Sequence, residues 1–319
     1  MKNSRPILVT GGCGFIGAHL VERLLRDGKS VVVIDDLSTG SLENLAAVKN
    51  HPQLRIIQAK VSDCAELPEL AAHAEYIFHL AATVGVELVV QSALHVLEAS
   101  FNETQILLRA ALKNSTPLLL TSTSEVYGKS AKPEFIEDDD LLIGPPGQSR
   151  WSYACSKLTD EFLALAYARE KGLPVTIVRL FNTVGPRQTG RYGMVLPRFI
   201  AAAKSGTPLK VFGDGAQSRC FCLVHDVVEA LVRLQNCQSA RGEIFNIGGT
   251  EEISILELAQ LVVATLGSKS PIELIPYDQA YSPGFDDMRR RKPLVEKLAS
   301  TVNFKPQTTL REIIRLTAS

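Results

Sequence analysis

A glycine-rich turn between a short apolar strand and an amphipathic helix constrains this chain more than any other feature. The pattern predicts a strand over Arg5–Thr10 and a helix over Ile16–Asp27. Between them lie Gly11, Gly14 and Gly17, spaced as TGxxGxxG. Gly11 allows a tight turn, Gly14 lets the backbone approach a diphosphate, and Gly17 allows close packing of helix on sheet. A doubly wound α/β fold is predicted, with the first helix pointing its N-terminus at an anion.

An acidic residue follows the glycine turn at the distance that a dinucleotide site requires. Asp35 ends the predicted strand Ser30–Ile34, about 20 residues beyond the turn. A carboxylate there accepts hydrogen bonds from ribose hydroxyls and repels a 2′-phosphate. The next residues, Asp36-Leu37-Ser38, offer no cation to bind that phosphate. The sequence therefore predicts NAD rather than NADP as the cofactor.

Buried apolar runs alternate with helical patterns through the first part of the chain. The further expected elements are strands at Leu54–Gln58, Tyr76–Leu80, Pro117–Thr121 and Val175–Leu180, and helices at Val90–Leu112 and Trp151–Lys171. Continuous apolar strands separated by helices are typical of a parallel sheet covered on both faces. A Rossmann fold is therefore expected.

The regular alternation of apolar strands and helical patterns ends after Gly185–Pro186. The pattern predicts helices over Leu196–Ser205, Ile255–Leu266 and Arg311–Leu316, with short strands at Leu209–Phe212, Ile244–Asn246 and Ile272–Ile275. This irregular spacing argues against an extension of the sheet. We predict a Rossmann domain over residues 1–185 and a smaller C-terminal α/β cap over residues 186–319. One strand or helix of the cap could return to the first domain.

Composition limits the partners. The 319 residues carry 34 Lys+Arg and 34 Asp+Glu, whereas nucleic-acid and acidic-membrane binders usually show a basic excess. There is no membrane-spanning apolar run and no signal-peptide pattern, and the six scattered cysteines include no CxxC pair. We expect a cytoplasmic protein with free thiols and no metal, membrane or nucleic-acid partner. The acidic run Glu137–Asp140 is expected to be a solvated loop.

A tyrosine and a lysine share one face of a predicted helix. Tyr153 and Lys157 lie four residues apart. Tyrosine, with an ordinary pKa of about 10, is a poor base at neutral pH, but a nearby ammonium and the positive nicotinamide favour the phenolate. Thr123, at the end of the preceding strand, places a hydroxyl where it can share a substrate hydrogen bond with Tyr153. The pattern predicts removal of a proton from a sugar hydroxyl while hydride leaves for NAD.

These motifs resemble the extended short-chain dehydrogenases/reductases, a family of nucleotide-sugar epimerases, dehydratases and decarboxylases. Other matching stretches are His79–Ala82, Phe181-Asn182, Gly213–Gly215, Asn246–Gly248 and Asp286–Pro293. The resemblance implies cofactor contacts from Gly11, Gly14, Phe15, Ile16, Gly17, Asp35, Asp63, Leu80, Ala81, Ala82, Tyr153 and Lys157. It implies nucleotide-sugar contacts from Asn182, Arg191, Arg219 and Arg291.

The resemblance also implies a homodimer. The two long helices, Val90–Leu112 and Trp151–Lys171, would form a four-helix interface with their counterparts in a second copy. Both helices carry apolar residues beyond the number that one sheet face needs: Leu94, Leu97, Phe162 and Leu165.

The residues around the predicted site favour one reaction of this family, in which every member first oxidises the sugar C4 hydroxyl. Thr123-Ser124-Glu125 resembles the UDP-glucuronate decarboxylases, as do Arg150–Cys155 and Arg291-Lys292-Pro293. Oxidation at C4 makes the C5 carboxylate part of a β-keto acid, which loses CO₂ readily. Glu125 and Arg291 would orient that carboxylate or manage the proton returned to C5.

Other reactions remain open. Arg187–Gly193 resembles UDP-glucose 4-epimerases, while Ser100 and Glu103 replace the family's usual Asn and Gly. A 4-epimerase acting on a UDP-hexose or UDP-hexuronate is therefore the alternative. A 4,6-dehydratase would carry Asp in place of Ser124, and a non-catalytic NAD-binding regulator would have lost the Thr, Tyr or Lys of the site.

Overall fold

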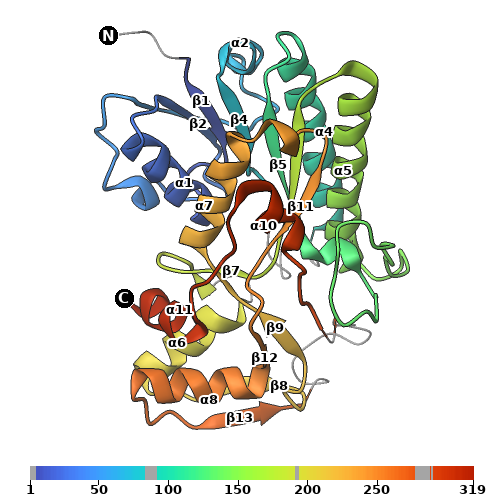
Figure 1. The fold of residues 1–319 in the computed structure, drawn as a ribbon. Coiled ribbons are helices and arrows are strands. Elements are labelled where there is room, and N and C mark those ends of the chain that lie inside the picture. Colours follow the sequence, from blue (N-terminus) through green and yellow to red (C-terminus); the bar gives the residue numbers. More distant parts are fainter. Residues whose placement is uncertain (1–4, 83–91, 191–193, 277–287, 289) are drawn as a thin grey trace.

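The computed structural model of this chain describes residues 5–82, 92–190, 194–276, 288 and 290–319. Its centre is a seven-stranded sheet in the order β11-β6-β5-β4-β1-β2-β3 (Figure 1). All of its strand pairs are parallel. The strands are β1 (Ile7–Thr10), β2 (Val31–Asp35), β3 (Leu54–Gln58), β4 (Tyr76–His79), β5 (Leu118–Thr123), β6 (Val175–Leu180) and β11 (Ile244–Ile247). The doubly wound Rossmann fold is confirmed.

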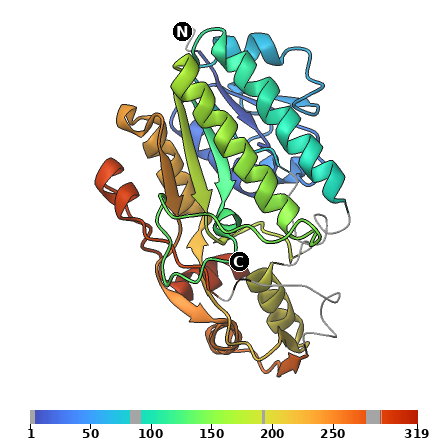
Figure 2. The same ribbon diagram turned by 90° about the vertical axis from the view of Figure 1, so that its right-hand side faces the viewer.

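Helices cover both faces of this sheet (Figures 1 and 2). Alternate residues of β1 face opposite ways: Ile7 and Val9 pack into one hydrophobic cluster, and Leu8 packs into the other. The first cluster includes residues of α1 (Phe15–Arg26), α7 (Val224–Gln235) and α10 (Glu296–Val302). The second includes residues of α2 (Leu67–His73), α4 (Ala93–Leu112) and α5 (Trp151–Lys171).

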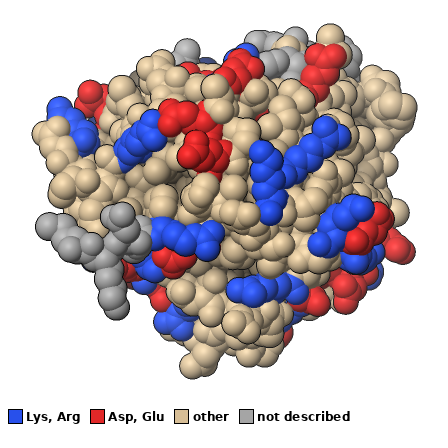
Figure 3. All heavy atoms as spheres, turned by 90° about the horizontal axis from the view of Figure 1, so that it is seen from above, with Lys and Arg blue, Asp and Glu red and all other residues tan. Residues whose placement is uncertain are grey.

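The outer surface of the described structure carries side chains of both charges. Figure 3 shows Lys and Arg side chains interspersed with Asp and Glu over one face of the molecule. Among the described residues, no helix is both long and apolar enough to cross a membrane.

The C-terminal part of the chain completes the sheet. β11 pairs with β6, with Ile244 opposite Ile177. The expectation that this part would not extend the sheet is therefore wrong. Four residues suffice because β11 adds to an existing strand edge, and three of them are buried. The sequence prediction also left out α7, which packs against α1.

The remaining C-terminal elements form a separate layer below the sheet (Figure 1). Its hydrophobic cluster is built around buried side chains such as Leu196, Leu209, Leu258 and Ile313. β8 pairs with β13 in parallel, β9 pairs with β12 antiparallel, and β7 pairs with β10 between this layer and the sheet. The elements are β7 (Thr183–Val184), α6 (Val195–Ser205), β8 (Leu209–Phe212), β9 (Ser218–Cys220), β10 (Cys222–Leu223), β12 (Glu252–Ser254), α8 (Ile255–Leu266), β13 (Ile272–Ile275) and α11 (Leu310–Ala318). Three 3₁₀ helices, η1 (Leu42–Leu45), η2 (Ser124–Tyr127) and η4 (Gln238–Ala240), complete the described elements.

A loop predicted to be solvated is partly buried. Glu137 and Asp139 are each 8% exposed. Glu137 accepts the backbone N–H of Asn246 on β11 at 2.8 Å, and Asp139 accepts that of Ile136 at 3.0 Å. The expectation of a solvated loop is wrong for these two residues, because their side chains are buried and their carboxylates accept backbone N–H groups.

A buried guanidinium joins this loop to the sheet. Arg179 on β6 donates to Glu161 on α5 at 2.8 Å, to the Tyr127 hydroxyl at 3.0 Å and to the Glu137 carbonyl at 2.9 Å. The Arg179 and Glu161 side chains are each 3% exposed. Removing one partner of a buried ion pair leaves the other charge buried and unpaired, so this contact is costly to break.

We therefore expect Arg179→Met to lower the free energy of unfolding by about 3–5 kcal/mol. The matched control is Arg55→Met, because Arg55 pairs with Glu66 while both side chains are about half exposed. An exposed pair contributes about 0–1 kcal/mol. Urea denaturation of both variants measures the difference. Equal losses in the two variants would contradict the assigned role of Arg179.

Candidate active site

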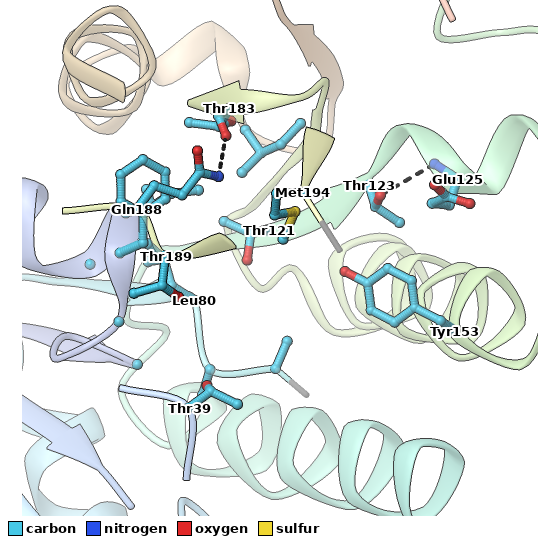
Figure 4. Close-up of a pocket in the computed structure, with 18 of the residues that line it drawn as sticks. Thr39, Leu80, Thr121, Thr123, Glu125, Tyr153, Thr183, Gln188, Thr189 and Met194 are labelled. Atoms are coloured by element: carbon cyan, nitrogen blue, oxygen red, sulfur yellow. Dashed lines mark hydrogen bonds between the residues drawn. The ribbon is translucent and has the colours of Figure 1, made fainter. Parts of the chain in front are cut away.

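A cavity of about 1360 Å³ lies at the carboxyl ends of the sheet strands, where the sheet faces the C-terminal layer. Residues after β1, β2, β4, β5 and β6 line it, and so do residues of α6, β8 and β9. Figure 4 shows side chains from these distant segments converging on one space. Strand order reverses between β1 and β4, the place where open α/β sheets bind ligands.

The glycine turn forms one wall of the cavity. Gly11 has φ +72°, and a Cβ there would lie 2.6 Å from the Ala81 nitrogen. A Cβ on Gly17 would lie 2.1 Å from the Gly11 carbonyl oxygen, so only glycine permits this approach. The N-cap of α1 is Gly14, which provides no side-chain cap. The N–H groups of the first turn are thus left for an anion, and the turn fits a dinucleotide diphosphate.

The predicted ribose-binding carboxylate is tied to this turn. Asp35 is 7% exposed; its Oδ2 accepts the N–H of Cys13 and its Oδ1 that of Leu37, each at 2.8 Å. Burial raises the pKa of Asp35 more than these two N–H groups lower it. The predicted cofactor residues that line the cavity are Gly11, Gly14, Phe15, Ile16, Gly17, Asp35, Leu80, Ala81, Ala82, Tyr153 and Lys157. Asp63 is not among the lining residues, because its side chain is exposed and bonds Ser62.

The proposed proton-transfer residues meet on the opposite wall. α5 brings Tyr153 and Lys157 to the cavity; β5 ends there at Thr123, and η2 begins there at Ser124. Figure 4 shows Tyr153 directed into the cavity beside the strand end that carries Thr123. The Thr123 hydroxyl also accepts the Glu125 N–H at 3.2 Å and so caps η2.

Tyr153 is held as a phenol by the protein around it. Burial raises its pKa well above the ordinary value, and the carboxylates of Glu125 and Asp160 raise it further. The Thr123 hydroxyl acts in the opposite direction. We expected Lys157 to lower the pKa of Tyr153. In the protein without bound cofactor, burial of the phenol is the largest effect, and it raises this pKa.

Arginines surround the acidic residue of the site. Glu125 accepts a hydrogen bond from Arg291 and another from Arg150, the latter at 3.3 Å. Burial alone would raise the pKa of Glu125, but Arg291, Arg150 and Arg219 outweigh it and lower that pKa. An ionised carboxylate thus lies among three guanidinium groups in this part of the cavity.

Sequence reasoning assigned no role to Arg150. It lies three residues before Tyr153, so helical spacing could have placed it on the same face. Of the predicted substrate residues, Asn182, Arg219 and Arg291 line the cavity. The Asn182 amide donates to the Cys220 carbonyl at 2.8 Å. Arg191 lies outside the described residues.

A glycine turn on a parallel sheet, with a tyrosine, a lysine and a threonine across the cavity, defines an NAD-dependent oxidoreductase-type site. The chain belongs to the NAD dependent epimerase/dehydratase family, which matches residues 7–248. NAD is the cofactor of this family.

Curated relatives and solved structures extend this result. The chain is 42% identical, over 97% of its length and 95% of the relative's, to a UDP-N-acetyl-alpha-D-glucosaminuronate decarboxylase from Bacillus cytotoxicus. It is 35% identical to UDP-glucuronic acid decarboxylase 1 from Arabidopsis thaliana, over 96% of this chain and 67% of the relative. A UDP-glucuronic acid 4-epimerase from Bacillus cereus, solved with a fluorinated UDP-glucuronic acid and NAD, superposes with a TM-score of 0.88 at 26% identity, covering 98% of each chain.

We expect Asp35→Ala to weaken NAD binding and to narrow the preference for NAD over NADP. The reason is that Asp35 both fixes the glycine turn and repels a 2′-phosphate. Titration calorimetry with NAD and NADP measures both effects, and Asp27→Ala at the C-cap of α1 is the control. Equal affinities of the unaltered protein for the two dinucleotides would contradict the assignment.

Proposed function

We propose that this protein is an NAD-dependent decarboxylase of UDP-linked hexuronates, with UDP-glucuronate as its substrate. The observation that carries the proposal is the contact of Glu125 with Arg291 and Arg150 in the cavity that also holds Tyr153. A site for a neutral hexose has no need of this buried cationic cluster. The relatives whose names state decarboxylation of UDP-hexuronates support the same conclusion.

The first step takes place at the sugar C4 hydroxyl. Tyr153 accepts the hydroxyl proton, Lys157 stabilises the phenolate, and Thr123 holds the C4 oxygen by a hydrogen bond. Bound NAD supplies the hydride acceptor, and the positive charge of its nicotinamide favours the phenolate that the protein alone disfavours. Asn182 and Arg219 bind the nucleotide diphosphate, for which a guanidinium fork is well suited.

The second step is the loss of the carboxylate. Arg291 and Arg150 orient the C5 carboxylate while Glu125 fixes the two guanidinium groups. With a ketone at C4, the bond between C5 and the carboxylate breaks, CO₂ leaves, and the electron pair becomes an enolate on the C4 oxygen. Tyr153 or a neighbouring hydroxyl, such as that of Ser124, supports this oxygen. C5 then takes a proton, and return of the hydride to C4 gives a UDP-pentose.

The alternative is 4-epimerisation of a UDP-hexuronate. The superposition on a UDP-glucuronic acid 4-epimerase favours it, because the same cationic cluster could hold a carboxylate that is retained. Incubation with UDP-glucuronate, its 2-acetamido analogue and UDP-glucose, followed by mass spectrometry, tests both functions. A product lighter by CO₂ supports the decarboxylase. An isobaric product identifies the epimerase and overturns our proposal.

We expect Glu125→Ala to retain NADH formation but to slow CO₂ release by roughly 10²-fold or more. The physical reason is that Arg291 and Arg150 lose the carboxylate that holds them in place. Absorbance of NADH and release of CO₂ are followed in parallel. Glu134→Ala is the control, since Glu134 pairs with Lys292 on the surface. In a UDP-hexose 4-epimerase, whose substrate has no carboxylate for these arginines to hold, Glu125→Ala would leave turnover nearly unchanged.

We also propose that the protein forms a homodimer through α4 and α5, which lie side by side on the outside of the sheet (Figure 2). Four large apolar side chains remain exposed there: Leu94 at 70%, Phe162 at 69%, Phe101 at 40% and Leu97 at 38%. Leu165, which we expected on this surface, packs against the core instead. The cytoplasmic location and the lack of nucleic-acid or membrane partners stay predictions.

Phe162→Glu should convert the dimer to a monomer, because it places a charge in the apolar interface. Light scattering at micromolar concentration measures the mass. Phe304→Glu, on a partly buried residue beside α7, serves as the control for nonspecific effects. A monomeric mass for the unaltered protein would contradict the dimer.

A further inference from the structure

A buried carboxylate lies directly behind the lysine of the site. Asp160 follows Lys157 by three residues on α5, and its Oδ2 is 3.5 Å from the Lys157 ammonium. The two side chains are 0% and 3% exposed. The same Oδ2 accepts a hydrogen bond from Ser100 on α4 at 2.7 Å. Ser100 is one of the two positions at which the sequence departs from the usual pattern of the family.

The structure assigns Asp160, held by Ser100, as a positioning residue that offsets the charge of Lys157. In doing so it sets the pH range in which Tyr153 accepts the C4 proton. This inference rests on the roles proposed above for Tyr153 and Lys157. Asp160 does not line the cavity, and so it acts through the lysine rather than on the substrate.

Lys157 and Asp160 act on the pKa of Tyr153 in opposite directions. Lys157 favours the phenolate of Tyr153, whereas a carboxylate close behind the ammonium cancels part of that effect. In agreement, Asp160 is among the groups that raise the pKa of Tyr153. Asp160 therefore delays ionisation of Tyr153, while it also gives the buried ammonium the counter-charge that such a group needs.

The other groups around the pair have distinct roles. On β4, His79 bonds the hydroxyls of Thr10 and Thr104, and burial lowers its pKa to about 3, so it stays neutral near pH 7. On α5, Glu161 faces Arg179 and not Lys157. In η2, Glu125 pairs with Arg291 and Arg150, and it raises the pKa of Tyr153 as Asp160 does.

One further group near Lys157, Glu103, has a pKa close to neutral pH. Burial is the main factor that raises the pKa of Glu103 on α4 to about 7, and Lys157 is among the charges that act on it. The experiment must therefore distinguish the titration of Glu103 from the effect of Asp160 on Tyr153. Glu103→Gln removes its titration without changing the shape of the side chain.

The test is the pH dependence of turnover in the Glu103→Gln background, with and without Asp160→Asn. Removal of the carboxylate should move the acidic limb of the profile to lower pH by about one unit, the usual size of such environmental shifts. Glu161→Gln is the matched control, because it neutralises an adjacent buried carboxylate that pairs with a different cation. Glu161→Gln should lower the thermal stability and leave the acidic limb of the pH profile unshifted.

A second variant keeps the test decisive where Asp160→Asn does not fold. Ser100→Ala frees the Oδ2 atom that Ser100 shares with Lys157, so the ion pair strengthens and the limb should move slightly to higher pH. Some variants that fold could turn over more slowly at every pH, with the acidic limb of the pH profile unshifted. That result would mean that Asp160 has a purely structural role, and it would overturn the inference. Tyr153→Phe, measured beside them, tests the proposed function separately. Wild-type turnover in that variant would refute the tyrosine's role, irrespective of what Asp160 does.

Discussion

The parallel direction of all seven sheet strands is the constraint on which the site depends. Since every strand ends at the same edge, residues far apart in the chain meet there. For this reason one cavity is lined by Asp35 at the end of β2, Thr123 at the end of β5 and Asn182 after β6. The reversal of strand order between β1 and β4 places the glycine turn at the centre of that edge.

Two buried ion pairs lie beside the site. Arg179 pairs with Glu161 behind the sheet, and Lys157 pairs with Asp160 behind the tyrosine. Uncompensated buried charges are costly, so such pairing is expected. Around Glu125, in contrast, three guanidinium groups act on one carboxylate. This cluster of guanidinium groups is compatible with the substrate proposed above, which carries both a diphosphate and a carboxylate.

The C-terminal part of the chain contributes to both the fold and the site. β11 extends the sheet, while Arg219 on β9 and Arg291 reach the cavity from the opposite side to the glycine turn. The glycine turn and these two arginines thus come from different parts of the sequence.

Local patterns determined most of the fold and the cofactor wall. Apolar runs, helical spacing and the glycine turn depend on neighbours within a few residues, so β3, β6 and α5 were predicted with their observed bounds. Only the tertiary structure decided the contacts between distant segments. It placed β11 on the sheet edge, buried Glu137 against Asn246, and brought Arg150 and Arg291 to one carboxylate. It also brought Ser100, from another helix, to Asp160. These arrangements depend on packing and burial across the whole chain, which the spacing of residues along a single element does not encode.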